Sequence, residues 1–212
     1  MKKIISLFAR NYDGDRLVRD EIVPGAEWVV NGEGFATEKV DGTSCLVRDG
    51  VLYKRYDAKH GKAPPPNFEA AQEPDPVTGH WPGWIPVEWE PSSLYHLEAW
   101  CYHKHQALHE MPDWTYELIG PRVQGNPYRL AHHVLERHGI RYLMKDATPP
   151  RDFESLREWF IENVIEGIVW WQDITDPDSE KVKIKRRDFG LAWPVAPEGV
   201  AALDLLSRFT GK

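Results

Sequence analysis

The apolar residues of this chain fall into short runs separated by polar turns, a pattern typical of β-strands. Two β-prone runs, Cys45–Arg48 and Val51–Lys54, flank Asp49-Gly50. Because both residues of an Asp-Gly turn accept positive φ, this segment predicts a β-hairpin. Similar runs predict a strand within MKKIISLFAR at the N-terminus and further strands at Trp28–Val30, Leu94–Tyr102, Trp114–Ile119, Gly167–Trp171 and Val182–Lys185.

Helical periodicity is less common. It predicts three helices, at Tyr128–His138, Asp152–Val164 and Gly199–Phe209. Gly139 would end the first helix, and the third would be the last element of the domain. Residues 61–91 are rich in proline and tryptophan without periodicity, which predicts a long loop or flap. Since neither an internal repeat nor a linker is visible, we expect one α+β domain over residues 1–212, with mostly antiparallel sheets flanked by helices.

Composition narrows the class of protein. Two cysteines, Cys45 and Cys101, argue against a disulfide scaffold and favour a reducing cytoplasm. The apolar run near the N-terminus lacks a cleavage site, and none reaches the roughly 18 residues that span a bilayer, so we expect no membrane association. A net charge of −7 excludes nucleic-acid binding through bulk charge, but it allows an enzyme whose cations gather in one groove.

Five short stretches carry groups that could do chemistry. Each alone has an ordinary structural explanation, such as a solvated charge at a strand end or the solvent-exposed face of an edge strand. They are Glu38-Lys39-Val40-Asp41-Gly42, Lys54-Arg55, Glu117 in YELIGPRVQGNP, Glu166-Gly167 in IEGIVWW, and KVKIKRRDFG from Lys181.

The last stretch stands out by its alternation. A strand period of two places Lys181, Lys183 and Lys185 on one face, opposite Val182 and Ile184. Three neighbouring ammonium groups repel one another unless an anion lies across them, and polyphosphate is the natural candidate. The same clustering is expected to lower the pKa of a neighbouring lysine and so to favour a neutral, nucleophilic amine.

Taken in order, KVDG, YELIGP, EGIV and KIKRRDF resemble the motifs of the covalent nucleotidyltransferase superfamily, which holds ATP-dependent ligases and mRNA capping enzymes. The resemblance covers about residues 35 to 190. It implies a nucleotidyltransferase domain of the ATP-grasp-like ligase type. It also implies that Lys39 attacks the α-phosphate of ATP and carries AMP as a phosphoramidate, with Mg²⁺ or Mn²⁺ as the metal.

The family's pattern then assigns roles residue by residue. It implies that Lys183 and Lys185 contact the α-phosphate, that Glu117 holds a ribose hydroxyl, and that Glu166 binds the metal ion or its waters. Arg55 matches the family's ribose- or phosphate-contacting arginine, although its neighbour Lys54 could be confused with it. The remaining expected nucleotide contacts are Glu38, which would read adenine N6, the motif residues Val40, Asp41 and Gly42, and Phe189, which could stack on a base or equally belong to the core.

Within the superfamily the details favour RNA ligases. Ser44 stands where DNA ligases and capping enzymes usually have an arginine, and only 27 residues follow Lys185 (212 − 185), so we expect no OB domain. The resemblance implies an RNA substrate with 5′-phosphate and 3′-hydroxyl ends, which Arg186 and Arg187 could grip, and no obligate protein partner. A minimal DNA nick ligase and a non-catalytic nucleotide- or RNA-binding module remain alternatives.

Two further stretches, one rich in tryptophan and one rich in histidine, have side chains that could bind a ligand. Trp81, Trp84 and Trp89 could stack on unpaired bases, but a loop pinned by its own hydrophobic cluster is favoured. The spacing of His103, His105 and His109 fits no standard zinc pattern, so we expect these histidines at the surface.

Overall fold

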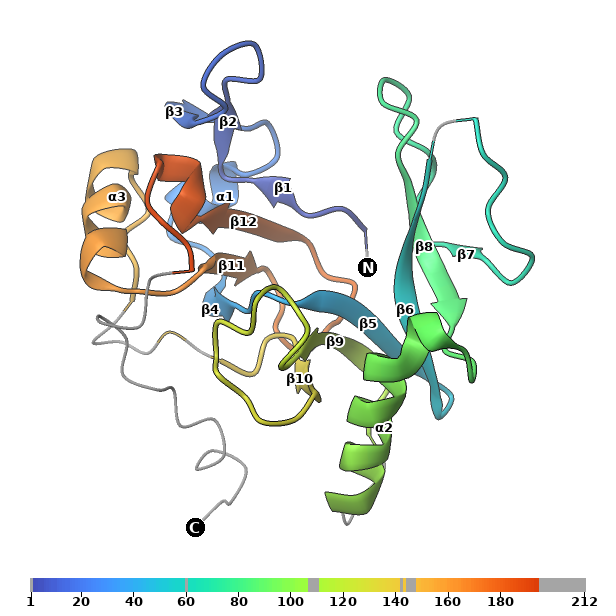
Figure 1. Cartoon of the computed structure of the whole chain (residues 1–212). Coiled ribbons are helices and arrows are strands. Elements are labelled where there is room, and N and C mark those ends of the chain that lie inside the picture. The colour runs from blue at the N-terminus through green and yellow to red at the C-terminus, as the bar shows by residue number, and fades with distance from the viewer. Residues whose placement is uncertain (1, 60, 107–110, 142, 144–147, 195–212) are drawn as a thin grey trace.

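A computed structural model describes residues 2–59, 61–106, 111–141, 143 and 148–194. The described chain is α+β, with two main sheets and few helices (Figure 1). Among the described residues, none of the helices is both long and apolar enough to cross a membrane.

The first sheet has the order β1-β12-β11-β4. Its strands are β1 (Ile5–Ser6), β12 (Lys181–Lys185), β11 (Gly167–Trp171) and β4 (Phe35–Lys39), and only β1 runs parallel to its neighbour. One face of this sheet is covered by α3 (Phe153–Glu162) and the 3₁₀ helix η3 (Arg186–Phe189), as Figure 1 shows. The core there joins residues of β11 and β12, such as Ile168 and Ile184, to Leu156 and Phe160 of α3.

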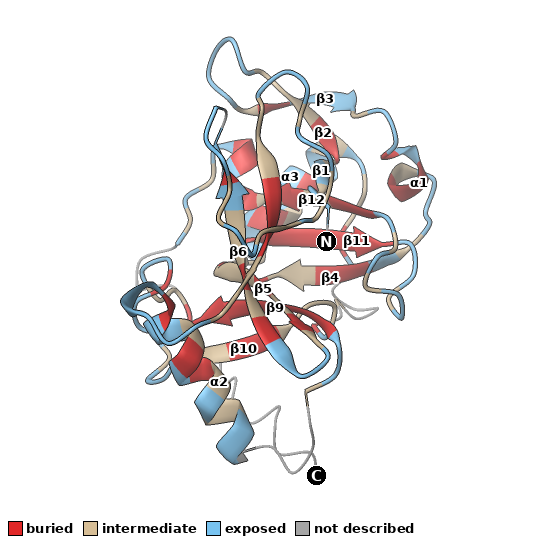
Figure 2. Cartoon of the chain, turned by 90° about the vertical axis from the view of Figure 1, so that its right-hand side faces the viewer, coloured by how far each residue is buried: buried red, intermediate tan, exposed pale blue. Residues whose placement is uncertain are grey.

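The second sheet has the order β10-β9-β5-β6-β8-β7 and is antiparallel throughout. Its strands are β10 (Val134–Arg137), β9 (Trp114–Ile119), β5 (Thr43–Arg48), β6 (Val51–Ala58), β8 (Trp81–Pro86) and β7 (Glu69–Ala70). Val169 and Trp171 of the first sheet pack into its core, so the two sheets meet through these side chains. Figure 2 shows the buried residues concentrated in β9, β11 and β12.

Smaller elements complete the fold. They are the ribbon β2 (Phe8–Arg10) with β3 (Val18–Ile22), the short helix α1 (Glu27–Val30), the 3₁₀ helix η1 (Pro91–Ser93) and helix α2 (Leu94–Gln106), which packs against β10.

Much of the expected secondary structure is confirmed. The hairpin around Asp49-Gly50 forms β5 and β6, the strands predicted at 114–119, 167–171 and 182–185 are β9, β11 and β12, and the predicted helix 152–164 is α3, with Asp152 as its N-cap. Three predictions are wrong: residues 28–30 and 94–102 are helical, and residues 128–138 form turns followed by β10. The predicted helix 199–209 lies outside the described residues.

The proline-rich stretch 61–91 is more ordered than a loop. The whole of its β8 pairs with Tyr53–Ala58 of β6 and forms an arm with it, with β7 added at the edge. Phe68 packs edge-on against Tyr56 and Trp81, at centroid distances of 5.9 and 5.1 Å. The expected hydrophobic cluster is therefore confirmed for Trp81.

Candidate active site

Lys39 ends β4 and faces the second sheet. In the register of the first sheet, Gly167 pairs with Lys39 on one side and with Lys185 on the other. A side chain at Gly167 would be crowded, because a Cβ there would lie 2.4 Å from the carbonyl oxygen of Ile184. Glycine at this position thus lets β11 lie close between the two lysine-bearing strands.

The Lys39 ammonium is paired with Glu166. Its Nζ lies 2.5 Å from Glu166 Oε2 and 3.4 Å from the carbonyl oxygen of Val40. Burial alone would lower the pKa of Lys39, but the carboxylates of Glu166 and Glu117 outweigh it and raise this pKa. The expectation that cation clustering lowers the pKa of the nucleophilic lysine is therefore wrong for Lys39, because a buried carboxylate touches it.

The lowered pKa belongs to Lys183 instead. Burial, Lys185 and Lys39 together lower the pKa of Lys183 to about 8. Lys185 Nζ lies 3.6 Å from Glu166 Oε1, so Glu166 faces two ammonium groups. Lys39, Lys183 and Lys185 thus form a cation cluster around one buried carboxylate.

Lys181 does not join this cluster. Its Nζ donates to the carbonyl oxygens of Pro177 and Ser179, at 2.7 and 2.8 Å, and lies 4.1 Å from the ring centroid of Trp171. The strand period predicted its face correctly, but the turn before β12 binds its ammonium group.

A cavity of about 360 Å³ opens beside the cluster, between the two sheets. The predicted site residues that line it are Glu38, Lys39, Val40, Arg55, Glu117 and Lys183. Ser44 and His138, for which the sequence predicted no direct contact, line it as well. The hydroxyl oxygen of Ser44 is buried and has no hydrogen-bond partner.

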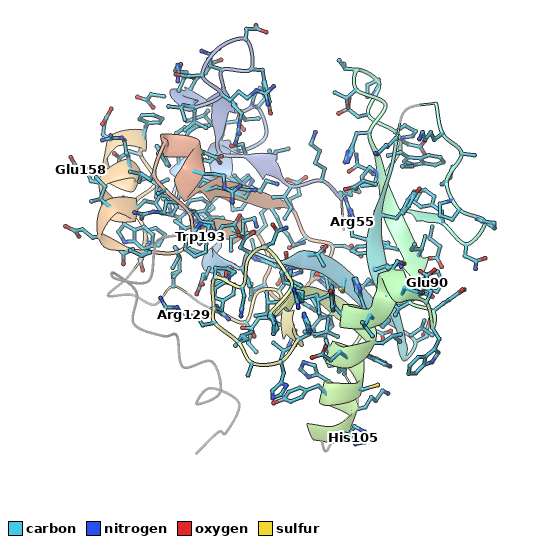
Figure 3. The ribbon with its side chains drawn as sticks, in the orientation of Figure 1. Arg55, Glu90, His105, Arg129, Glu158 and Trp193 are labelled. Atoms are coloured by element: carbon cyan, nitrogen blue, oxygen red, sulfur yellow. The ribbon has the colours of Figure 1, made fainter. Side chains whose placement is uncertain are left out.

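Arg55 and the neighbouring Lys54 have different surroundings, and only Arg55 lines the cavity. Arg55 lines the cavity, with its guanidinium 5.2 Å from the ring centroid of Trp84 and its Nε 3.3 Å from Asp57 Oδ1. Figure 3 shows Arg55 on the arm, on the side that faces the first sheet. Lys54 Nζ instead donates to Glu90, Ser92 and Ser93, which ties β6 to the start of α2.

The rest of the KVDG motif is held by packing. The backbone N–H of Asp41 donates to the Tyr128 hydroxyl at 2.7 Å, and Asp41 Oδ2 accepts from Trp193 Nε1 at 2.8 Å. Gly42 lies against β9, where a Cβ would meet the carbonyl oxygen of Leu118 at 2.2 Å. This contact fixes the distance between the Lys39 loop and the strand that carries Glu117.

Glu38 points away from Lys39, as its place on the strand requires. Its Oε1 accepts from Arg141 Nη1 at 3.0 Å, and Arg141 Nε donates to Glu136 Oε1 at 2.6 Å. The three side chains form a buried charged triad that the sequence did not predict. Reading of adenine N6 by Glu38 stays a prediction.

The structure changes the expectations for the residues after β12. Phe189 is 7% exposed and packs among Phe8, Phe153 and Phe160, so it belongs to the core rather than to a base-stacking surface. Arg186 is also buried, and its guanidinium donates to the carbonyl oxygens of Ala192 and Asn163, so the expected RNA contact is replaced by a structural one. Arg187 remains half-exposed, 4.0 Å from Asp41.

The histidine and tryptophan stretches have structural roles for the most part. His103 is not a surface residue, because its Nε2 accepts from the Leu135 N–H at 3.0 Å and so joins α2 to β10, whereas His105 lies exposed at the far end of α2 (Figure 3). His109 lies outside the described residues.

Trp84 is buried, and Trp89 is 86% exposed. No group of three or more potential metal ligands occurs among the described residues.

The chain is similar to several known proteins. A family model described as RNA ligase 1 matches residues 102–205, a span that includes Glu117, Glu166, Lys183 and Lys185 but not Lys39. RNA ligase 1 of Danio rerio is 28% identical, and the match covers 76% of this chain and 69% of that protein. RNA ligase 1 of Pongo abelii and of Mus musculus are each 29% identical, covering 75% and 76% of this chain and 68% of each relative. Together these matches show that the chain is similar to proteins named RNA ligase 1 over about three quarters of its length.

Proposed function

We propose that this chain is an ATP-dependent RNA ligase that joins 5′-phosphate and 3′-hydroxyl ends through a covalent lysyl-AMP on Lys39. The observation that carries the proposal is that Lys39, Glu117 and Lys183, from three separate strands, line one cavity. Glu166, from a fourth segment, contacts Lys39 beside it. The similarity to proteins named RNA ligase 1 supports the class of substrate.

The cavity has the chemistry that a nucleoside triphosphate needs. Its cation cluster is poorly compensated by carboxylates, since the lowered pKa of Lys183 reports repulsion from Lys185 and Lys39 as well as burial. An anionic phosphate would relieve this repulsion. Away from the cluster, Glu117 offers a hydrogen-bonding group suited to a ribose.

In the proposed first step, Lys39 Nζ forms a bond to the α-phosphorus of ATP while the bond to the pyrophosphate oxygen breaks. Lys39 must first lose a proton, and Glu166 is the carboxylate that touches it. Burial raises the pKa of Glu166 even though Lys39 opposes this change, so Glu166 is suited to accept that proton. Positioning and charge neutralisation then supply most of the catalysis, as in other phosphoryl transfers.

A magnesium or manganese ion would be held by Glu166 through the water molecules of the ion, which leaves the carboxylate able to accept the Lys39 proton. Because the described residues offer no cluster of three protein ligands, such an ion would take its ligands from substrate phosphates and water, which is common for Mg²⁺. When bound, it would neutralise charge that develops on the phosphates.

In the remaining steps, AMP passes from Lys39 to the 5′-phosphate of RNA, and a 3′-hydroxyl then displaces AMP as the two ends join. Arg187 is half-exposed beside the KVDG loop and is the arginine that we propose for contact with the RNA backbone. Joining a 5′-phosphate to a 3′-hydroxyl restores the phosphodiester bond of a broken strand, so RNA repair is the role that we propose.

Intact mass spectrometry tests the proposal. After removal of bound AMP, incubation with ATP and Mg²⁺ should add the mass of one AMP to the chain, and Lys39→Ala should add none. Lys181→Ala is a matched control from the same lysine-rich face, and it should retain the adduct. An unmodified chain that gains no adduct from ATP, GTP or NAD would contradict the proposal and favour a non-catalytic binding module.

The choice between RNA and DNA follows from a second measurement. Nicked duplexes of RNA, of DNA and of RNA paired with DNA, together with single strands, should be sealed only where RNA supplies the reacting ends. Efficient sealing of an all-DNA nick would instead favour the minimal DNA ligase.

A further inference from the structure

The strand beside Glu117 supplies a histidine that the motifs do not contain. His138 directly follows β10, and its backbone N–H donates to the carbonyl oxygen of Thr115 at 3.0 Å. Its ring lies across two residues of β9: Nε2 is 2.8 Å from Glu117 Oε2, and Nδ1 is 3.0 Å from Thr115 Oγ1. Thr115 and Glu117 are two residues apart and therefore share one face of the strand.

Both edges of the imidazole ring are engaged. Thr115 is buried, and the carbonyl oxygen of His138 accepts from Trp114 Nε1 at 2.9 Å, so the backbone of His138 is fixed as well. With the Thr115 hydroxyl donating to Nδ1, the tautomer that carries its proton on Nε2 can donate to Glu117. The ring therefore holds one carboxylate oxygen of Glu117 and leaves the other to the cavity that both residues line.

A glutamate side chain has three rotatable bonds, and holding them in one geometry costs conformational entropy when a ligand binds. A neighbour that fixes the carboxylate beforehand removes this cost from the binding step. Support of this kind from neighbouring side chains commonly decides whether a binding group lies within reach of its ligand.

We propose that His138 is a positioning residue that fixes the Glu117 carboxylate for the ribose hydroxyls of ATP. This inference rests on the proposed function for the location of the nucleotide. It goes beyond that function by stating that discrimination between ribose and a deoxygenated sugar depends on His138 as well as on Glu117.

Isothermal titration calorimetry of ATP and of 2′,3′-dideoxyATP, in EDTA to prevent turnover, measures this discrimination. The unmodified chain should prefer ATP. His138→Phe keeps the ring but removes both nitrogens, and it should weaken ATP about tenfold, the effect of one hydrogen bond, while it leaves 2′,3′-dideoxyATP nearly unchanged. His138→Gln, whose amide can reach Glu117, should retain most of the preference.

Two further variants keep the test decisive. Thr115→Val removes the other anchor of the ring at nearly constant volume and should reduce the preference for ATP, and it also serves if His138→Phe fails to fold. Glu117→Gln combined with His138→Phe should lose little more than either change alone, because the two residues act on the same hydroxyls.

Equal weakening of both nucleotides in His138→Phe, or equal or absent binding by the unmodified chain, would overturn the inference. The intact-mass measurement keeps the two proposals separate. An AMP adduct together with an unchanged sugar preference in His138→Phe overturns only the role of His138. Loss of that preference without any adduct overturns only the ligase chemistry.

Discussion

At the scale of single residues, the buried guanidinium of Arg141 holds two carboxylates that would otherwise repel each other. It binds Glu38 beside the nucleophile and Glu136 on β10, and these carboxylates outweigh the effect of burial and raise the pKa of Arg141. Arg141→Met should remove the guanidinium group from both buried carboxylates and lower the free energy of unfolding by about 3–5 kcal/mol. Urea denaturation followed by circular dichroism measures this loss.

A matched control is Arg19→Met. Arg19 pairs with Asp15 at 2.8 Å, but both side chains are about half exposed, so the loss should stay below about 1 kcal/mol. Equal losses in the two variants would show that the Arg141 triad contributes no more than a surface ion pair.

These residues also show where prediction from sequence ends. The order of the motifs was sufficient to predict Lys39, Glu117, Glu166 and Lys183 as one site, because each stands in a recognisable short motif. Arg141 and His138 stand in no such motif, and their partners are 103 and 21 residues away. The pairing of β9 with β10 brings His138 to Glu117, and a backbone hydrogen bond from the Glu38 N–H to the Arg141 carbonyl oxygen holds Arg141 beside β4.

At the scale of elements, β12 carries two lysines whose ammonium groups are costly to bury. The pKa values of Lys181 and Lys183 are lowered from 10.5 to about 8, in both cases chiefly by burial. Between pH 8 and 10.5 each of these lysines therefore binds more protons in the unfolded chain than in the folded chain, and its contribution to the free energy of unfolding should rise with pH by at most about 3 kcal/mol. Urea denaturation at intervals across this range measures the rise.

Lys183→Met should remove the Lys183 share of this rise, and Lys181→Met combined with Lys183→Met should remove both. The change should be visible as greater stability of the variants at pH 7.5, where the folded chain still has to bury charged ammonium groups. A double variant whose stability rises as steeply with pH as that of the unmodified chain would contradict this account of β12.

The elements that were predicted wrongly from the sequence are those whose secondary structure depends on contacts with other segments of the chain. Residues 94–102 are rich in β-prone aromatic residues, yet they form α2, which starts after Pro91 and buries Leu97 and Ala99. Residues 128–138 have helical spacing, but Gln124, Asn126 and Arg129 adopt positive φ, and the segment then pairs with β9. Local periodicity cannot report this pairing, because the hydrogen-bond partners come from another segment.

At the scale of the whole molecule, the cavity lies where the two sheets meet, and each sheet has its own core. Lys39 and Lys183 belong to the first sheet, while Glu117 and Arg55 belong to the second. A nucleotide that contacts both sets should stabilise both sheets together. At a concentration of 100 times its Kd, ATP should add about 2.7 kcal/mol to the free energy of unfolding.

Hydrogen exchange with mass spectrometry shows where this stabilisation falls. With ATP in EDTA, exchange should slow in β4 and β12 of the first sheet and in β9 and β10 of the second, and it should change little in β7, at the outer edge of the arm. Glu117→Ala removes a contact on the second sheet only, so it should reduce protection of β9 and β10 more than that of β4 and β12. Protection confined to one sheet in the unmodified chain would mean that the ligand does not bridge the cavity, and the adenylyl-transfer geometry proposed for Lys39 would then lack its ribose contact.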